Sequence, residues 1–131
     1  MLIVKTRRIL LIENKNAIRE VTQLCLETGE GWEVMTAASR QEAIAKTKTQ
    51  KVDVILVDLD TFASDRDLST ILHQLENNPV TQNIPVILLT TTVSSQELEQ
   101  FTKLGVRTVI AKPFDLMTLA SQVSAVLGWN R

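Results

Sequence analysis

The chain has 131 residues, which is the length of one ordinary domain and too short for two. Hydrophobic residues make up 44% and charged residues 22%, so the chain can bury a core without disulfide or metal cross-links. The net charge of −1 argues against a nucleic-acid-binding surface over the whole domain, and the single cysteine excludes a disulfide framework. No apolar run is long enough to span a membrane and no signal peptide is evident, so we expect a soluble, cytoplasmic protein.

Five short apolar runs predict five β-strands. Four of the runs are apolar at successive rather than alternate positions, which is typical of parallel strands that are covered on both faces, and the second run in the chain is weaker. In chain order the predicted strands are Ile9–Ile12, Trp32–Met35, Val54–Val57, Val86–Leu89 and Val109–Ala111.

Segments with helical periodicity separate these strands. Three of them repeat apolar residues at the spacing of one helix face, which we expect to pack into the core. The three faces are Ala17, Ile18, Val21, Leu24 and Cys25; Leu68, Ile71, Leu72 and Leu75; and Leu116, Leu119, Ala120, Val123 and Val126. Ser39 with Glu42, and Ser94 with Glu97, have capping-box spacing and predict two further helix starts. The segment Ser95–Leu104 is expected to be the least amphipathic of these helices.

Strand and helix therefore alternate five times along the chain. This order predicts an α/β fold, a single doubly wound five-stranded parallel sheet with helices on both faces. In such sheets, ligands bind outside the carboxyl ends of the strands. The residues at or after those ends are Glu13, Asn14, Asp58, Thr90 and Lys112.

These strand-end residues form one candidate site. Asp58 and Glu13 could share a hard cation through oxygen ligands, while Lys112 and Thr90 could bind an anionic group attached at Asp58. Each residue taken alone is better explained as an ordinary turn or strand stop, because strands commonly end in polar residues. Their convergence on one edge of the sheet favours a functional site.

These motifs, over roughly Arg8 to Leu127, resemble the receiver domain of two-component response regulators. The first strand ends in Glu13-Asn14 like the acidic pair of that family, and the third ends in Asp58 like its phosphoacceptor strand. The stretches Asn78-Pro79, Ile84–Thr90 and Lys112-Pro113-Phe114 complete the resemblance. It implies one receiver domain over residues 1–131, with a core of about 8–127, and the flavodoxin-like strand order 2-1-3-4-5.

The resemblance also implies roles for these residues. Asp58 would accept a phosphoryl group, Thr90 would be the switch hydroxyl, and Lys112 would contact the phosphoryl oxygens. A magnesium ion would be held by Glu13, Asn14, Asp58 and the backbone carbonyl of Asp60. The chain would then be a signalling switch rather than a dedicated enzyme, with at most self-phosphorylation from a donor and autodephosphorylation.

Several residues depart from the family pattern. Asn14 replaces the second acidic residue, so we expect weak magnesium binding; Val109 replaces an aromatic switch residue, and Thr61-Phe62 replaces a methionine-proline turn. Thr91 stands where a small residue usually follows the switch hydroxyl.

Two hypotheses therefore stay open: a phosphorylatable switch, and a receiver-like (pseudo-receiver) interaction module that works without phosphorylation. A flavodoxin-like small-molecule binder is disfavoured, because no loop offers a phosphate or flavin cradle.

The resemblance implies protein partners. A histidine kinase or phosphotransfer protein would supply the phosphoryl group, and an output protein would bind the face formed by residues 95–127. We expect neither a nucleic acid nor a membrane as partner, and a homodimer stays open. His73 is expected to be exposed rather than catalytic, and Trp32 and Trp129 could serve packing or partner contacts.

Overall fold

The computed structural model describes residues 6–61, 65–90, 94–111 and 118–129. Its strands form one parallel sheet in the order β2-β1-β3-β4-β5, which confirms the predicted fold class and strand order. The strands are β1 (Arg8–Ile12), β2 (Glu33–Ala37), β3 (Val54–Asp58), β4 (Val86–Thr90) and β5 (Val106–Ala111). The central strand, β3, is the one that ends in Asp58.

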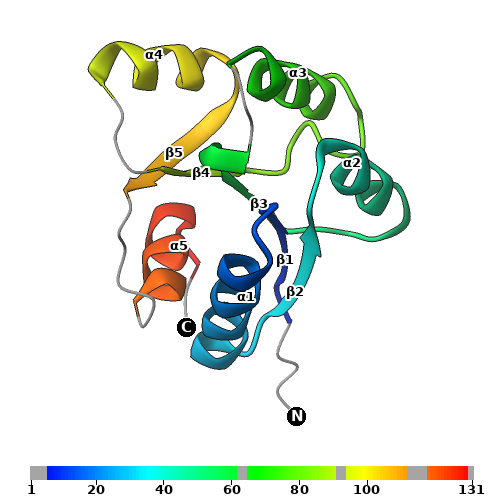
Figure 1. Cartoon of the computed structure of the whole chain (residues 1–131), viewed down its shortest axis with the longest axis vertical. Helices are drawn as coiled ribbons and strands as arrows, with labels where there is room; N and C mark the ends of the chain where they lie inside the picture. The colour runs from blue at the N-terminus through cyan, green and yellow to red at the C-terminus, as the bar shows by residue number, and fades with distance from the viewer. Residues whose placement is uncertain (1–5, 62–64, 91–93, 112–117, 130–131) are drawn as a thin grey trace.

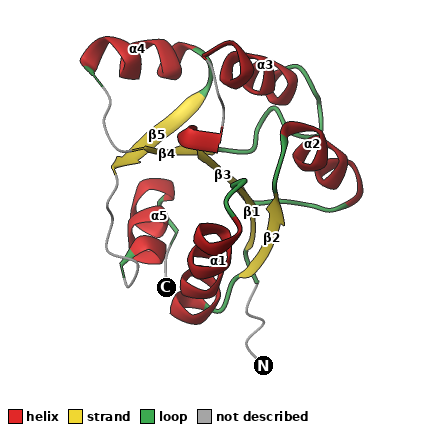
Figure 2. Cartoon of the chain, in the orientation of Figure 1, coloured by secondary structure: helices red, strands yellow, loops and turns green. Residues whose placement is uncertain are grey.

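Helices cover both faces of the sheet, as predicted for a doubly wound fold. They are α1 (Asn16–Glu30), α2 (Arg40–Thr49), α3 (Asp65–Glu76), α4 (Ser95–Lys103) and α5 (Leu119–Leu127), with a short 3-10 helix, η1 (Leu59–Thr61). Figure 1 shows α1 and α5 on one face and α2, α3 and α4 on the other. Figure 2 shows the regular alternation of strand and helix. Within the described ranges, no helix is both long and apolar enough to cross a membrane.

The two faces of the sheet carry separate hydrophobic cores. Successive side chains of a strand point to opposite faces, so Leu10 and Ile12 pack under α2 and α3 while Ile9 and Leu11 pack under α1 and α5. All four are buried. Burial on both faces is the physical reason that the run Ile9–Ile12 is apolar at every position.

The apolar face of α1 is a correction to the sequence prediction. Ile18, Val21 and Leu24, which were expected in the core, are 42%, 47% and 59% exposed, and Cys25 is only half-buried. Thr22 and Leu26 are buried in their place. The reason is that α1 meets β1, β2 and α5 with its other side, and periodicity alone does not reveal which side that is.

The expectation that Ser95–Leu104 would be the least amphipathic helix is wrong. In α4 the apolar residues gather on one side, and in α2 they are scattered around the helix axis. Phe101 is nevertheless the one buried residue of α4, whose nine residues are all described. The helix is therefore held to the core by few contacts. The cause is the small number of its buried residues rather than a lack of amphipathicity.

Strands β2 and β5 differ most from prediction. Strand β2 spans Glu33–Ala37 rather than Trp32–Met35, and β5 begins at Val106 rather than Val109. Arg107 is exposed and Thr108 is half-buried, so the first half of β5 has no continuous apolar run. Strand β5 lies at the edge of the sheet and has a neighbouring strand along one edge only. Fewer of its residues are therefore enclosed by the protein than in a central strand.

The predicted capping box at the start of α2 is present. The Ser39 hydroxyl accepts a hydrogen bond from the Glu42 N–H (3.2 Å), and Glu42 Oε2 accepts one from the Ala38 N–H (2.9 Å). Lys46 Nζ lies 3.2 Å from Glu42 Oε1. The hydrogen bond from the Ala38 backbone, assisted by Lys46, lowers the pKa of the Glu42 carboxyl below 4.5.

This arrangement predicts a pH dependence of stability. Because the pKa of Glu42 is lower in the folded chain, its carboxylate stabilises the fold above its unfolded value of 4.5. That contribution disappears as the pH falls through the lower, folded pKa. We expect Glu42→Gln to lose less free energy of unfolding than the parent on acidification from about pH 6 to about pH 3, measured by urea denaturation. An equal loss in the two proteins would contradict the prediction.

The two tryptophans pack together at the end of the sheet where the strands begin. Trp32 and Trp129 meet edge to face, with ring centroids 5.3 Å apart and an interplanar angle of 89°. The Arg7 guanidinium lies 4.5 Å from the centroid of the Trp129 ring, a cation–π contact. Both tryptophans therefore have packing roles that join the segment after α5 to the starts of β1 and β2.

Candidate functional site

The carboxyl ends of β1, β3 and β4 bring the predicted acidic and hydroxyl residues together. Ile12 pairs with Val57 across β1 and β3, so Glu13 lies beside Asp58 at the next position. Asp58 in turn pairs with Leu89 of β4, and Thr90 follows directly. Adjacent strands are about 4.8 Å apart, so the three side chains are neighbours at one edge of the sheet.

The burial of these residues divides them into two groups. The side chains of Glu13, Asp58 and Thr90 are nearly closed off from solvent, with exposed fractions of 2%, 2% and 3%. Asn14 and Asp60 are exposed. The site therefore has a buried floor of two carboxylates and a hydroxyl, beneath a solvent-facing rim. Burying two carboxylates so close together is costly unless cations or hydrogen bonds offset their charge.

The Asp58 carboxylate is oriented by the turn that follows it. The 3-10 helix η1 directs the Asp60 N–H at Asp58 Oδ1, with a donor–acceptor distance of 2.9 Å. A backbone donor favours the ionised carboxylate over the neutral acid. This hydrogen bond fixes one oxygen of a nucleophile candidate at the end of the central strand.

Glu13 is held at three points. Its backbone N–H donates to the Ala37 carbonyl (2.9 Å), which extends the β1–β2 pairing by one residue. Its Oε2 accepts a long hydrogen bond from the Lys15 N–H (3.4 Å), and its carbonyl oxygen accepts one from Arg19 Nη1 (3.1 Å). These three hydrogen bonds therefore hold the turn between β1 and α1 that carries the buried Glu13 carboxylate.

Sequence reasoning missed Arg19. Its Nη2 donates to Asn16 Oδ1 (2.6 Å) while its Nη1 binds the Glu13 carbonyl, so the half-buried guanidinium fastens the first turn of α1 to the end of β1. Arg19 lies on the side of α1 that also carries Thr22 and Leu26, which face the core. The sequence did not indicate a role for Arg19, because the opposite, more apolar side of α1 was predicted to be the buried one.

The remaining predicted site residue, Lys112, lies outside the described residues, as does Thr91. Strand β5 ends at Ala111, which pairs with Thr90 of β4. Val109, the residue that replaces an aromatic switch residue, is half-buried on β5. His73 is exposed on α3, as expected.

The oxygen donors at this edge suit a hard cation such as Mg²⁺. Glu13 and Asp58 could offer carboxylates to such an ion, Asn14 an amide oxygen and Asp60 a backbone carbonyl. No group of three or more His, Cys, Asp or Glu side chains with metal-site geometry occurs among the described residues. These oxygen donors are therefore of the type that magnesium prefers. They include only two carboxylate side chains, Glu13 and Asp58, that could help to displace the ion's water molecules.

Comparison with known proteins gives a consistent result. A family model described as the response regulator receiver domain matches residues 9–124. The chain is 30% identical over 121 residues to the phosphate regulon transcriptional regulatory protein PhoB of Pseudomonas aeruginosa, and the match covers 92% of this chain and 52% of PhoB. The chain thus spans about half the length of that curated relative.

Solved structures share the fold. The chemotaxis response regulator CheY4 of Vibrio cholerae matches with a TM-score of 0.82 and 24% identity, covering 93% of this chain and 99% of CheY4. The receiver domain of the sensor histidine kinase PA1611 of P. aeruginosa, which holds a magnesium ion in its active site cleft, matches with a TM-score of 0.78 and 22% identity. That match covers 95% of this chain and 99% of the other.

Proposed function

Because the chain belongs to the response regulator receiver domain family, we propose that it is a phosphoacceptor switch whose Asp58 receives a phosphoryl group from a histidine kinase or phosphotransfer protein. The single observation that carries the proposal is the position of Asp58. It is a buried carboxylate at the end of the central strand, oriented by the Asp60 N–H and flanked by Glu13 and Thr90. Such an arrangement favours chemistry at one carboxylate oxygen.

The proposed reaction is a single phosphoryl transfer. An oxygen of Asp58 attacks the phosphorus, a P–O bond forms, and the P–N bond to the donor imidazole breaks with its electron pair remaining on the nitrogen. Transfer of this kind depends mainly on positioning and on stabilisation of charge at the phosphoryl oxygens. Magnesium, when bound through Glu13, Asn14, Asp58 and the Asp60 carbonyl, would neutralise part of that charge.

Thr90 and Lys112 have proposed roles around the phosphoryl group. The Thr90 hydroxyl, at the end of β4, would donate a hydrogen bond to one phosphoryl oxygen. The Lys112 ammonium would pair with another oxygen. Formation of these bonds would report phosphorylation to the loop after β4 and to the end of β5.

The partner surfaces follow from the same edge. The exposed apolar residues Ile18, Val21 and Leu24 form a stripe, the α1 stripe, along the helix that begins beside Asn14. A protein donor must place its phosphohistidine at Asp58, so it has to cover this neighbouring surface. An amphipathic helix of the donor would bury the α1 stripe.

The output protein would use the face of residues 95–127. Helix α4 in this face has one buried residue, Phe101, so a small change at the site could shift the helix.

Asn14 and Val109 favour a second candidate, a receiver-like module that works without phosphorylation. Asn14 weakens the charge of the metal site, and Val109 lacks a ring whose burial could report the state of Thr90. The two functions differ in one measurable property, which is whether Asp58 becomes phosphorylated.

Intact-mass spectrometry tests the proposed function. The parent chain, incubated with magnesium and acetyl phosphate as a small donor, is expected to gain the mass of one phosphoryl group, whereas Asp58→Asn gains none. Glu99→Gln is the control, because it removes the charge of an exposed carboxylate on α4 that has no part in the proposed site. Modification that persists in Asp58→Asn would exclude Asp58 as the acceptor. No modification of the parent, by this donor or by a phosphorylated histidine phosphotransfer protein, would favour the second candidate.

A further inference from the structure

Two exposed apolar side chains lie outside the α1 stripe. Among the described residues, five large apolar side chains are exposed, and three of them form that stripe. The other two are Val80, in the segment before β4, and Leu98, on α4, with exposed fractions of 64% and 42%. The charged side chains beside Val80 and those beside Leu98 have opposite signs.

Val80 lines a cavity at the end of the sheet where the strands begin. The cavity, which we call the α2 pocket, has a volume of about 340 Å³ and lies between the end of α2 and the segment before β4. Val52, Val80 and Ile84 give it an apolar lining. Lys48 and Lys51 give it positive charge, and the described residues that line it include no carboxylate. The α2 pocket therefore suits an apolar side chain that is accompanied by a carboxylate.

Helix α4 presents such a side chain. Leu98 lies between Glu97 and Glu99, and all three residues are exposed. Successive residues of a helix are about 100° apart around its axis, so the two carboxylates lie on either side of Leu98. Glu97 also accepts a hydrogen bond from the Ser94 hydroxyl (3.1 Å), so Glu99 is the carboxylate better able to reach a partner.

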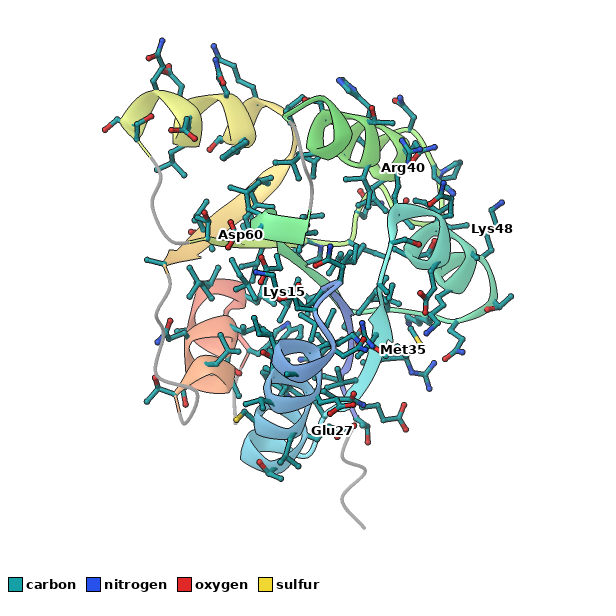
Figure 3. All side chains as sticks on the ribbon, viewed as in Figure 1. Lys15, Glu27, Met35, Arg40, Lys48 and Asp60 are labelled. Carbon is teal, nitrogen blue, oxygen red and sulfur yellow. The ribbon has the colours of Figure 1, made fainter. Side chains whose placement is uncertain are left out.

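The α2 pocket and Leu98 cannot meet within one chain. Lys48 lies on the far side of the molecule from α4 (Figure 3; α4 is labelled in Figure 1). A contact between the two surfaces therefore joins two copies of the chain. Because the surfaces differ, the contact is heterologous, and each copy that offers its α4 keeps its own α2 pocket for a further copy.

We propose that the chain self-associates head to tail, with Leu98 of one copy in the α2 pocket of the next and Glu99 paired with Lys48 and Lys51. The inference goes beyond the proposed function and requires no phosphorylation of Asp58. One helix in one pocket is a small interface of the weak, transient class, so association should depend on protein concentration. It should also weaken as salt is raised from about 0.05 M to about 0.5 M, because its specificity comes from charge.

Sedimentation velocity of the unphosphorylated chain, at concentrations up to about 1 mM, tests this inference. Lys48→Glu sets like charges against each other, and Leu98→Lys replaces the apolar contact with an ammonium that faces two lysines. Each substitution is expected to weaken association by about tenfold or more. Both positions are exposed, so the fold should be kept. Lys15→Glu is the matched control, because Lys15 is an exposed lysine at the opposite end of the sheet, after β1.

A mixture of the two variants distinguishes a head-to-tail contact from a symmetric one. Neither variant alone should associate like the parent, but an equimolar mixture should do so, because the intact α2 pocket of Leu98→Lys can take the intact α4 of Lys48→Glu. A parent chain that stays monomeric up to about 1 mM would overturn the inference. So would a Lys48→Glu variant that associates like the parent, or a mixture that does not recover association. No phosphoryl donor is present, so these outcomes are independent of the phosphorylation experiment.

Discussion

An Asn14→Asp variant is expected to bind Mg²⁺ at least about tenfold more tightly than the parent chain. Even changes beyond the direct ligands of a metal commonly alter affinity by about 10- to 100-fold, and a carboxylate at position 14 adds a full charge. Magnesium depends on carboxylates to displace its tightly held waters, and the described site has two buried ones, Glu13 and Asp58. Tighter binding should also speed phosphorylation of Asp58 by acetyl phosphate at low magnesium.

Calorimetry measures this affinity directly. Asn83→Asp is a suitable control, since Asn83 is exposed in the segment before β4, at the opposite end of the sheet, and the substitution adds the same charge. The prediction fails if Asn14→Asp and the parent have equal magnesium affinities. A different oxygen, for example from the side chain of Asp60, would then have to supply the missing ligand.

A Val21→Glu variant is expected to lose most of its phosphorylation by a protein donor while keeping that by a small donor. Val21 lies in the middle of the α1 stripe and is 47% exposed, so a glutamate there is tolerated by the fold. In a complex the same glutamate would be buried against an apolar surface. Loss of a central apolar contact commonly costs more than about 1 kcal/mol of binding, and a desolvated charge adds to that cost. We therefore expect transfer from a phosphorylated histidine phosphotransfer protein to slow by about tenfold or more.

The control for this experiment is Val80→Glu. Val80 is 64% exposed in the segment between α3 and β4, on the end of the sheet away from Asp58, and should make no contact with the donor. Rates are measured by the transfer of radiolabel from the protein donor, and by intact mass with acetyl phosphate. If Val21→Glu and Val80→Glu accept the phosphoryl group from the protein at the same rate, the donor does not dock on the α1 stripe. Slower labelling by acetyl phosphate would instead indicate damage to the site itself.

The parallel sheet and the residues at its carboxyl edge could be predicted from the order of residues along the chain. The runs at Ile9, Val54 and Val86 are apolar throughout because each strand is buried on both faces, and local pattern is sufficient to detect that. The capping box of Ser39 and Glu42 was equally visible, since both its partners lie within one turn of chain. Parallel strands then place Glu13, Asp58 and Thr90 at the same edge without further information.

Which side of α1 faces the protein interior could not be predicted in the same way. Helical periodicity groups Ile18, Val21 and Leu24 on one face, but packing against β1, β2 and α5 buries Thr22 and Leu26 instead. The hydrogen bond from Arg19 to the Glu13 carbonyl could not be predicted either. It joins a side chain on the packed face of α1 to the backbone at the end of β1. Contacts between elements depend on how the elements are oriented in space, and the spacing of residues along one helix does not contain that orientation.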